Sequence, residues 1–144
     1  MIKLFFAAFV AFCFSEAYSQ QNEKPDIYQI CLTRYLESYK IEAKSKGSVF
    51  VERNDLTTES MSAKISNISI LYLNQQDIKV ETKNEKRIHL IRVNPMRIED
   101  ELIKISIINF YVSRRKNHFR YINSGGETYK FKFNCENSQF EIVK

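Results

Sequence analysis

The cysteines are the residues of this chain whose chemistry depends most directly on the surrounding fold. The chain contains three of them, Cys13, Cys31 and Cys135, and Cys13 falls in an apolar N-terminal run. Cys31 and Cys135 both occupy positions that the hydrophobic pattern predicts to face inward. A disulfide bond between them is one interpretation, and two buried free thiols are the other. Neither cysteine has a neighbour at ligand spacing, so we predict no metal site.

The two histidines, His89 and His118, are candidates for acid–base chemistry near neutral pH. His89 shares a predicted strand face with Ile91 and Val93, and His118 follows a basic turn. No nucleophile motif accompanies either histidine, so we predict no catalytic residue. The alternative is a small enzyme or ligand-binding protein with a pocket between a helix and a sheet. That pocket would be lined by Tyr35, Tyr39, His89 and Arg92.

The densest positive cluster lies at a predicted hairpin, where Arg114, Arg115 and Lys116 form the turn and Arg120 lies on the next strand. Guanidinium groups can hold a phosphate or carboxylate through two hydrogen bonds, so these four residues are the candidate anion contacts. The alternative is a solvated hairpin tip that discourages edge pairing. The acidic turn at residues 99–101 lacks the ligand spacing of a calcium loop. We therefore predict no cofactor.

The first nineteen residues have the build of a secretory signal peptide. Lys3 precedes an apolar run over residues 4–14, and Ala17 and Ser19 are small residues at cleavage spacing. Cleavage after Ala17 is an alternative, and an uncleaved anchor is weaker because the run is about half the ~20 residues of a spanning helix. The sequence thus predicts a signal over 1–19, a disordered leader over 20–24 and a single domain over 25–144. The mature protein is expected to be secreted or periplasmic.

The charge balance narrows the class of partner. The chain has 22 basic and 17 acidic residues, a net charge of +5. This excess favours an acidic protein or an anionic surface component, such as a glycan or lipid headgroup, and export argues against nucleic acid. We expect an unidentified protein or an anionic surface component as partner, no membrane span after cleavage, and a candidate homodimer through an edge strand.

The elements that must position these residues begin with one amphipathic helix. Apolar residues recur at three- and four-residue steps from Tyr28 to Ala43, after a proline suited to a first turn. Asn74 is predicted to cap a second, short helix, QQDIKVETKNE. Alternation and β-branched residues predict the strands, which are 49–51, 68–73, 87–98, 102–114, 118–122, 127–135 and 140–143.

Two details of the predicted strands bear on the shape of the sheet. In the strand at 102–114 the apolar positions change phase at Ile107 and Ile108, which predicts a β-bulge near these two residues. Ser124, Gly125 and Gly126 are predicted to form a tight turn between two strands. Short connections favour antiparallel hairpins throughout.

These elements predict an α+β fold in which one long N-terminal helix packs on a curved antiparallel β-meander, with one additional short helix. The order resembles the cystatin-like and nuclear-transport-factor-like folds. The strings SGGETYKFKFNC and VFVERNDLTTE also resemble small exported bacterial proteins of unassigned function. The resemblance implies an exported setting and transfers no catalytic residue. We expect an exported, non-catalytic binding or interaction module.

Overall fold

The computed structural model describes residues 26–38, 48–116 and 118–143. The predicted signal peptide, the leader, Cys13 and Tyr39 lie outside the described residues, as does the predicted helix beyond Ser38. The elements are α2 (Ile27–Ser38), β1 (Ser48–Glu52), β2 (Lys64–Ile65), β3 (Ile68–Leu73), α3 (Gln75–Glu85), β4 (Arg87–Val93), β5 (Arg97–Glu99), β6 (Leu102–Arg115), β7 (His118–Asn134) and β8 (Gln139–Val143). The α+β class is confirmed.

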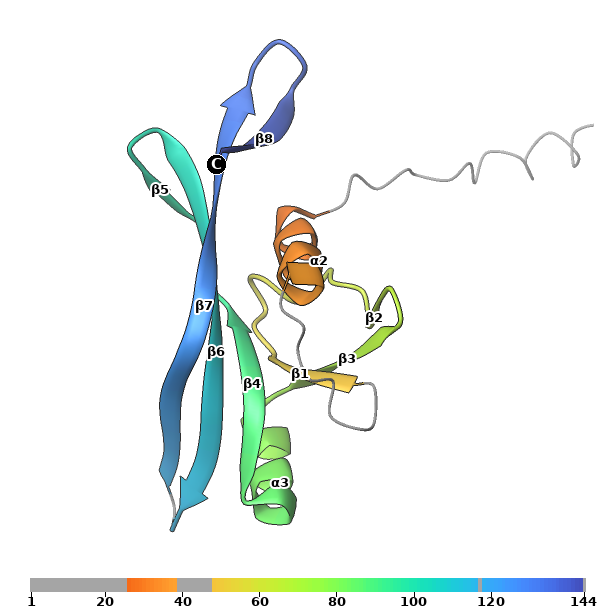
Figure 1. Ribbon diagram of the computed structural model, residues 1–144, viewed down its shortest axis with the longest axis vertical. Helices are drawn as coiled ribbons and strands as arrows, with labels where there is room; N and C mark the ends of the chain where they lie inside the picture. Colours follow the sequence, from red (N-terminus) through yellow and green to blue (C-terminus); the bar gives the residue numbers. More distant parts are fainter. Residues whose placement is uncertain (1–25, 39–47, 117, 144) are drawn as a thin grey trace, which may run out of the picture.

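The strands form one mixed sheet in the order β2-β3-β1-β4-β6-β7-β8, with β5 paired to β6 (Figure 1). The prediction of a purely antiparallel meander is wrong, because β1 pairs in parallel with β3 and with β4. A parallel arrangement needs a long crossover connection, and α3 supplies it between β3 and β4. From β4 onward the sheet is antiparallel.

Helix α2 packs on one face of this sheet, here called the α2 face. Its apolar stripe is buried, with Cys31, Leu32 and Tyr35 fully enclosed. The stripe packs against the sheet side chains Val51, Ile91, Val93, Ile105, Ile107 and Phe131. Burying such a stripe stabilises a helix more than its propensity does, which explains how a twelve-residue helix persists.

Helix α3 is confirmed at its predicted bounds, and its cap explains why it starts there. The Asn74 side chain accepts hydrogen bonds from the Gln76 and Asp77 amides at 2.8 and 3.0 Å, and the Asp77 carboxylate accepts from the Asn74 amide at 3.0 Å. This capping box satisfies donors that a helix start leaves free. The helix buries Ile78 in a second core with Leu73, Ile88, Leu90 and Val112.

The two cores lie on opposite faces of the sheet. Ile88 and Leu90 of β4 belong to the core beneath α3, whereas Ile91 and Val93 belong to the core beneath α2. Because side chains alternate across a strand, the two sets must point in opposite directions. Figure 1 shows α2 and α3 on opposite sides of β1. We call the second surface the α3 face.

An irregularity does lie near the predicted position, between Asn109 and Phe110, but the arrangement corrects its exact place and its cause. The apolar positions of β6 change from one face to the other because both faces of the strand are buried. Ile107 packs in the core beneath α2, and Val112 packs in the core beneath α3. The irregularity falls on β7 instead, since Asn109 pairs with Gly125 and Phe110 pairs with Asn123, which leaves Ser124 as the extra residue. The predicted turn at residues 124–126 is also wrong, because β7 runs through it.

The bulge changes which face the odd-numbered residues of β7 occupy. Tyr129 and Phe131 lie on the α2 face opposite Ile105 and Ile103, and beyond the bulge Tyr121 lies on the α3 face opposite Val112. A single long strand thereby contributes aromatic side chains to both cores. Gly126 is required at this place, because a Cβ there would lie 2.3 Å from the carbonyl oxygen of Ile107.

Candidate functional site

A row of basic side chains crosses three strands on the part of the α2 face that α2 leaves uncovered. Arg87 of β4 pairs with Ser113 of β6, and Ser113 pairs with Arg120 of β7, so all three residues share one face. Arg115 lies two residues beyond Ser113 on the same side, opposite His118. Arg87, Arg115, His118 and Arg120 are all exposed. We call these four residues the arginine face.

A second row beneath Arg87 holds its guanidinium in place. His89, Tyr111 and Ile122 pair across β4, β6 and β7 on the same face. The Arg87 guanidinium lies 4.0 Å from the centre of the Tyr111 ring, and the His89 ring meets Tyr111 edge-on with ring centres 4.1 Å apart. Cation–π contact of this kind restricts an arginine side chain and leaves its N–H groups free to donate outward.

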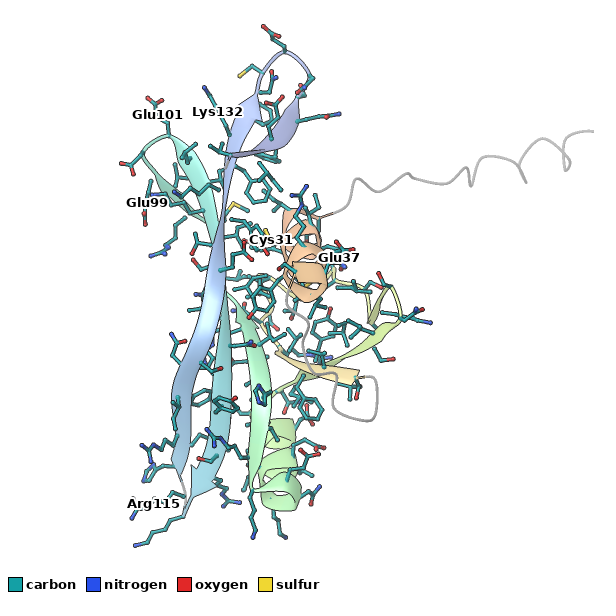
Figure 2. All side chains as sticks on the ribbon, viewed as in Figure 1. Cys31, Glu37, Glu99, Glu101, Arg115 and Lys132 are labelled. Carbon is teal, nitrogen blue, oxygen red and sulfur yellow. The ribbon has the colours of Figure 1, made fainter. Side chains whose placement is uncertain are left out.

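The predicted anion cluster is divided between the two faces. Arg115 and Arg120 share the arginine face, whereas Arg114 pairs with Phe119 and lies on the α3 face. The Arg114 Nε donates to the backbone carbonyl of Lys116 at 2.9 Å, and Lys116 has a positive φ of 55° in the turn. Figure 2 places Arg115 at the end of the β6–β7 hairpin, away from α3. The four predicted residues therefore do not form one site.

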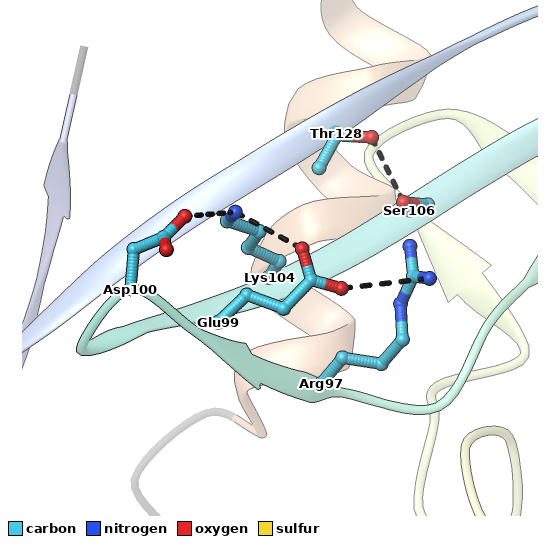
Figure 3. Close-up of polar contacts among 6 residues, drawn as sticks. All are labelled: Arg97, Glu99, Asp100, Lys104, Ser106 and Thr128. Atoms are coloured by element: carbon cyan, nitrogen blue, oxygen red, sulfur yellow. Dashed lines mark hydrogen bonds and ion pairs between the residues drawn. The ribbon is translucent and has the colours of Figure 1, made fainter.

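The arginine face is not neutralised by nearby carboxylates. Within the described ranges, Arg87, Arg115 and Arg120 form no ion pair. The acidic turn at the other end of the sheet behaves differently, because Lys104 Nζ contacts Glu99 and Asp100 at 3.1 and 3.2 Å (Figure 3). These bonds raise the pKa of Lys104. Glu99 and Asp100 of the acidic turn are thus paired, whereas the arginines of the arginine face meet no carboxylate within the described ranges.

On the α3 face of the same strands, Arg92 forms an ion pair with Glu52. The Arg92 guanidinium donates two hydrogen bonds to the Glu52 carboxylate, one of them from Nη2 at 3.1 Å. The bond to Glu52 raises the pKa of Arg92. The guanidinium also lies 4.9 Å from the Phe110 ring centre and 5.3 Å from that of Tyr121. Burial and the nearby Glu52 carboxylate raise the pKa of Tyr121.

The three predicted pocket residues that the structure describes do not converge. Tyr35 is fully buried on the α2 face, His89 is exposed on that face beyond the helix, and Arg92 is on the α3 face. A shallow hollow of about 310 Å³ does exist beside the bulge. It forms where Gly125 and Gly126 contribute no side chains to β7. Its other lining residues are Ser106, Ile107, Ile108, Asn123, Glu127 and Thr128.

The two side-chain hydroxyls in that hollow form a hydrogen bond with each other, since Ser106 Oγ and Thr128 Oγ1 lie 2.8 Å apart (Figure 3). The Asn123 Oδ1 accepts from the Gly125 amide at 2.8 Å. None of the eight residues around the hollow is a histidine or a cysteine. The hollow therefore has hydrogen-bonding capacity, but it offers no activated nucleophile.

The two cysteines occupy different environments. Cys31 is buried beneath α2, and burial raises the pKa of its thiol to about 12. Cys135 follows the end of β7 and is exposed, which corrects the prediction that it faces inward. Both are free thiols in the structure. The alternation in β7 predicted an inward position for Cys135, but Phe131 is the last residue of β7 in the core beneath α2, and Cys135 lies beyond it.

Arg87 is the arginine of this face that the sequence did not bring into the anion cluster. It lies more than twenty positions before Arg115, and only the pairing of β4 with β6 brings it beside the hairpin. In the described part of the chain, no group of three or more histidine, cysteine or acidic residues is placed to bind a metal ion. No helix of that part is long and apolar enough to cross a membrane.

Comparisons with protein-family models, with curated proteins and with solved structures found no significant match.

Proposed function

We propose that this chain is an exported, non-catalytic module that binds a negatively charged polysaccharide through the arginine face. One observation carries the proposal: three exposed arginines from three strands share one face and have no carboxylate partner among the described residues. An arginine presents five donors in a planar fork, which suits carboxylate and sulfate groups. Residues 1–19 lead us to expect export, so the protein would meet such a ligand in the periplasm or outside the cell.

The surroundings of the arginine face favour a polysaccharide over a lipid surface. Proteins that lie on membranes insert apolar side chains among the headgroups. The largest exposed aromatic side chains, Phe133 and Phe140, are on the β7–β8 hairpin, at the far end of the sheet from Arg115. Beside the arginine face, Ile122 is the one large aliphatic side chain that is exposed among the described residues. A flat row of donors is better suited to an extended, repeating polyanion.

The test compares two variants with the same net charge. Arg87→Gln/Arg115→Gln removes two positive charges from the arginine face. Lys130→Gln/Lys132→Gln removes two from exposed positions at the other end of β7, where Figure 2 labels Lys132. Binding to fluorescently labelled heparin, a soluble sulfated polysaccharide, is measured by anisotropy at several salt concentrations.

The arginine variant should bind at least about tenfold more weakly and show a shallower salt dependence, because charge-assisted hydrogen bonds are each worth about 1.5–3 kcal/mol. The lysine variant should change less than about twofold. Equal losses in both variants would mean that net charge alone attracts heparin, and the proposal would fail. Stronger binding to phosphatidylglycerol vesicles than to heparin would point to a lipid surface instead.

A further inference from the structure

Among the described strands, none pairs with the outer edge of β7 over most of its length. The strand has seventeen residues, but β8 pairs only with residues 130–134. From His118 to Thr128, no strand of the described chain pairs with this edge. An edge of this length presents unpaired backbone donors and acceptors that favour the addition of another strand. Most residues along it are exposed.

We propose that two copies of this chain pair through this edge, antiparallel, about a two-fold axis that passes between Asn123 and Ser124. The bulge makes the arrangement self-consistent. Residues seven positions apart normally point to opposite faces of a strand, but the extra residue Ser124 places Arg120 and Glu127 on the same face, opposite Ser113 and Ile107. In an isologous pair, that face of one copy continues into the same face of the other.

Charge complementarity selects this register. Pairing about that axis places Arg120 opposite the partner's Glu127, and symmetry repeats the pair. Glu127 is held on this face because the Tyr129 hydroxyl donates to its carboxylate at 2.7 Å. Arg120 has no ion-pair partner among the described residues. A register centred on Arg120 would instead place two guanidinium groups face to face.

The pair leaves room for the side chains along the axis. Ile122, which is 38% exposed, lies opposite the partner's Gly125, and Tyr121 lies opposite the partner's Gly126. The two arginine faces then occupy one continuous surface, with Arg87 and Arg115 of each copy available to a ligand. Two linked sites would bind a long polyanion more tightly than one. The pairing itself does not depend on polysaccharide binding.

Sedimentation velocity over a range of protein concentrations tests the proposal, without polyanion and with a reducing agent so that Cys135 cannot link copies. The wild-type chain should approach dimer mass. Arg120→Glu and Glu127→Arg should each raise the dissociation constant at least about tenfold, because each places like charges opposite one another twice. The double variant Arg120→Glu/Glu127→Arg should restore dimerisation.

Lys132→Glu is the matched control for Arg120→Glu, since it makes the same charge change on a residue outside the open edge. It should leave the dimer intact, and circular dichroism should show that every variant is folded. A wild-type chain that stays monomeric, a dimer that survives both single changes, or a double variant that stays monomeric would each overturn the proposal. Heparin binding by Arg87→Gln/Arg115→Gln is read separately, so the two proposals fail independently.

Discussion

Replacement of Gly126 by alanine tests the bulge that lets β7 serve both cores. The added Cβ would lie 2.3 Å from the carbonyl oxygen of Ile107 and 3.0 Å from the Cα of Ile108. Both are backbone atoms of the neighbouring strand, so a flexible side chain cannot relieve the contact. The separation from the oxygen must grow to at least 3.0 Å, which moves β7 away from β6 in the middle of their ladder.

The expected cost is about 3 kcal/mol in the free energy of unfolding. Overpacking against a fixed neighbour costs about 1–3 kcal/mol, and a distorted ladder hydrogen bond adds about 1 kcal/mol. The sign is informative, because glycine to alanine at a site without strain stabilises a protein by about 0.4–1 kcal/mol. Urea unfolding followed by circular dichroism gives the change from the midpoint and slope.

Ser124→Ala is the matched control for Gly126→Ala. Ser124 is exposed and is the unpaired residue of the same bulge. The substitution should therefore change the free energy of unfolding of the protein by less than about 0.5 kcal/mol. If Gly126→Ala proves as stable as Ser124→Ala, then β6 and β7 do not approach as described, and the account of the two-faced strand fails.

Three further predictions concern the thiols, the tyrosines and the cap of α3. In a chain without residues 1–19, iodoacetamide should modify Cys135 alone before unfolding, because Cys31 is buried with a pKa near 12; an intact mass with two adducts or none contradicts this. Burial raises the pKa of Tyr72 to about 12. The neutral phenol therefore stabilises the folded state fully below pH 10, and this contribution is lost as the pH rises toward 12. Tyr72→Phe should therefore lose less stability than wild type between these pH values in urea titrations, and equal losses would refute the assignment. Asn74→Ala should lower the free energy of unfolding by about 1–2 kcal/mol, whereas Asn74→Asp, which keeps the acceptor, should cost far less; similar losses in both would exclude the cap as the cause.

Local structure was predictable wherever one short segment contains its own signal. Asn74 followed by Asp77 three residues later predicts a capped helix, and α3 begins as expected. The strands at β1, β3 and β8 also match their predicted runs closely. Strand β2 was missed because two residues, Lys64 and Ile65, are too short for any periodic signal.

The bulge was misplaced because a one-dimensional pattern does not say how many faces of a strand are covered. In β6 the apolar positions change parity at Ile107 and Ile108, which is the pattern of a bulge in a strand with one buried face. Two helices on opposite faces produce the same pattern in a regular strand. The extra residue, Ser124, instead lies in a polar Gly-containing stretch that is also typical of a turn.

The arginine face was only partly predictable for a related reason. The hairpin turn identified Arg115 and Arg120, but alternation within one strand also places Arg114 on the other face. Arg87 joins the site through the register of β4 against β6, a contact between distant segments. Sequence spacing contains no signal for that register beyond the parity of the buried residues.

The most direct test of the proposed function is an NMR titration of the isotope-labelled chain with a short heparin oligosaccharide. If heparin binds at the arginine face, amide shifts should change at the start of β4 and around the β6–β7 turn, near Arg87, Arg115 and Arg120. Amide shifts around Lys130 and Lys132 should change little. Shifts centred on Lys130 and Lys132, or spread over all exposed basic residues in proportion to charge, would contradict an assigned binding face.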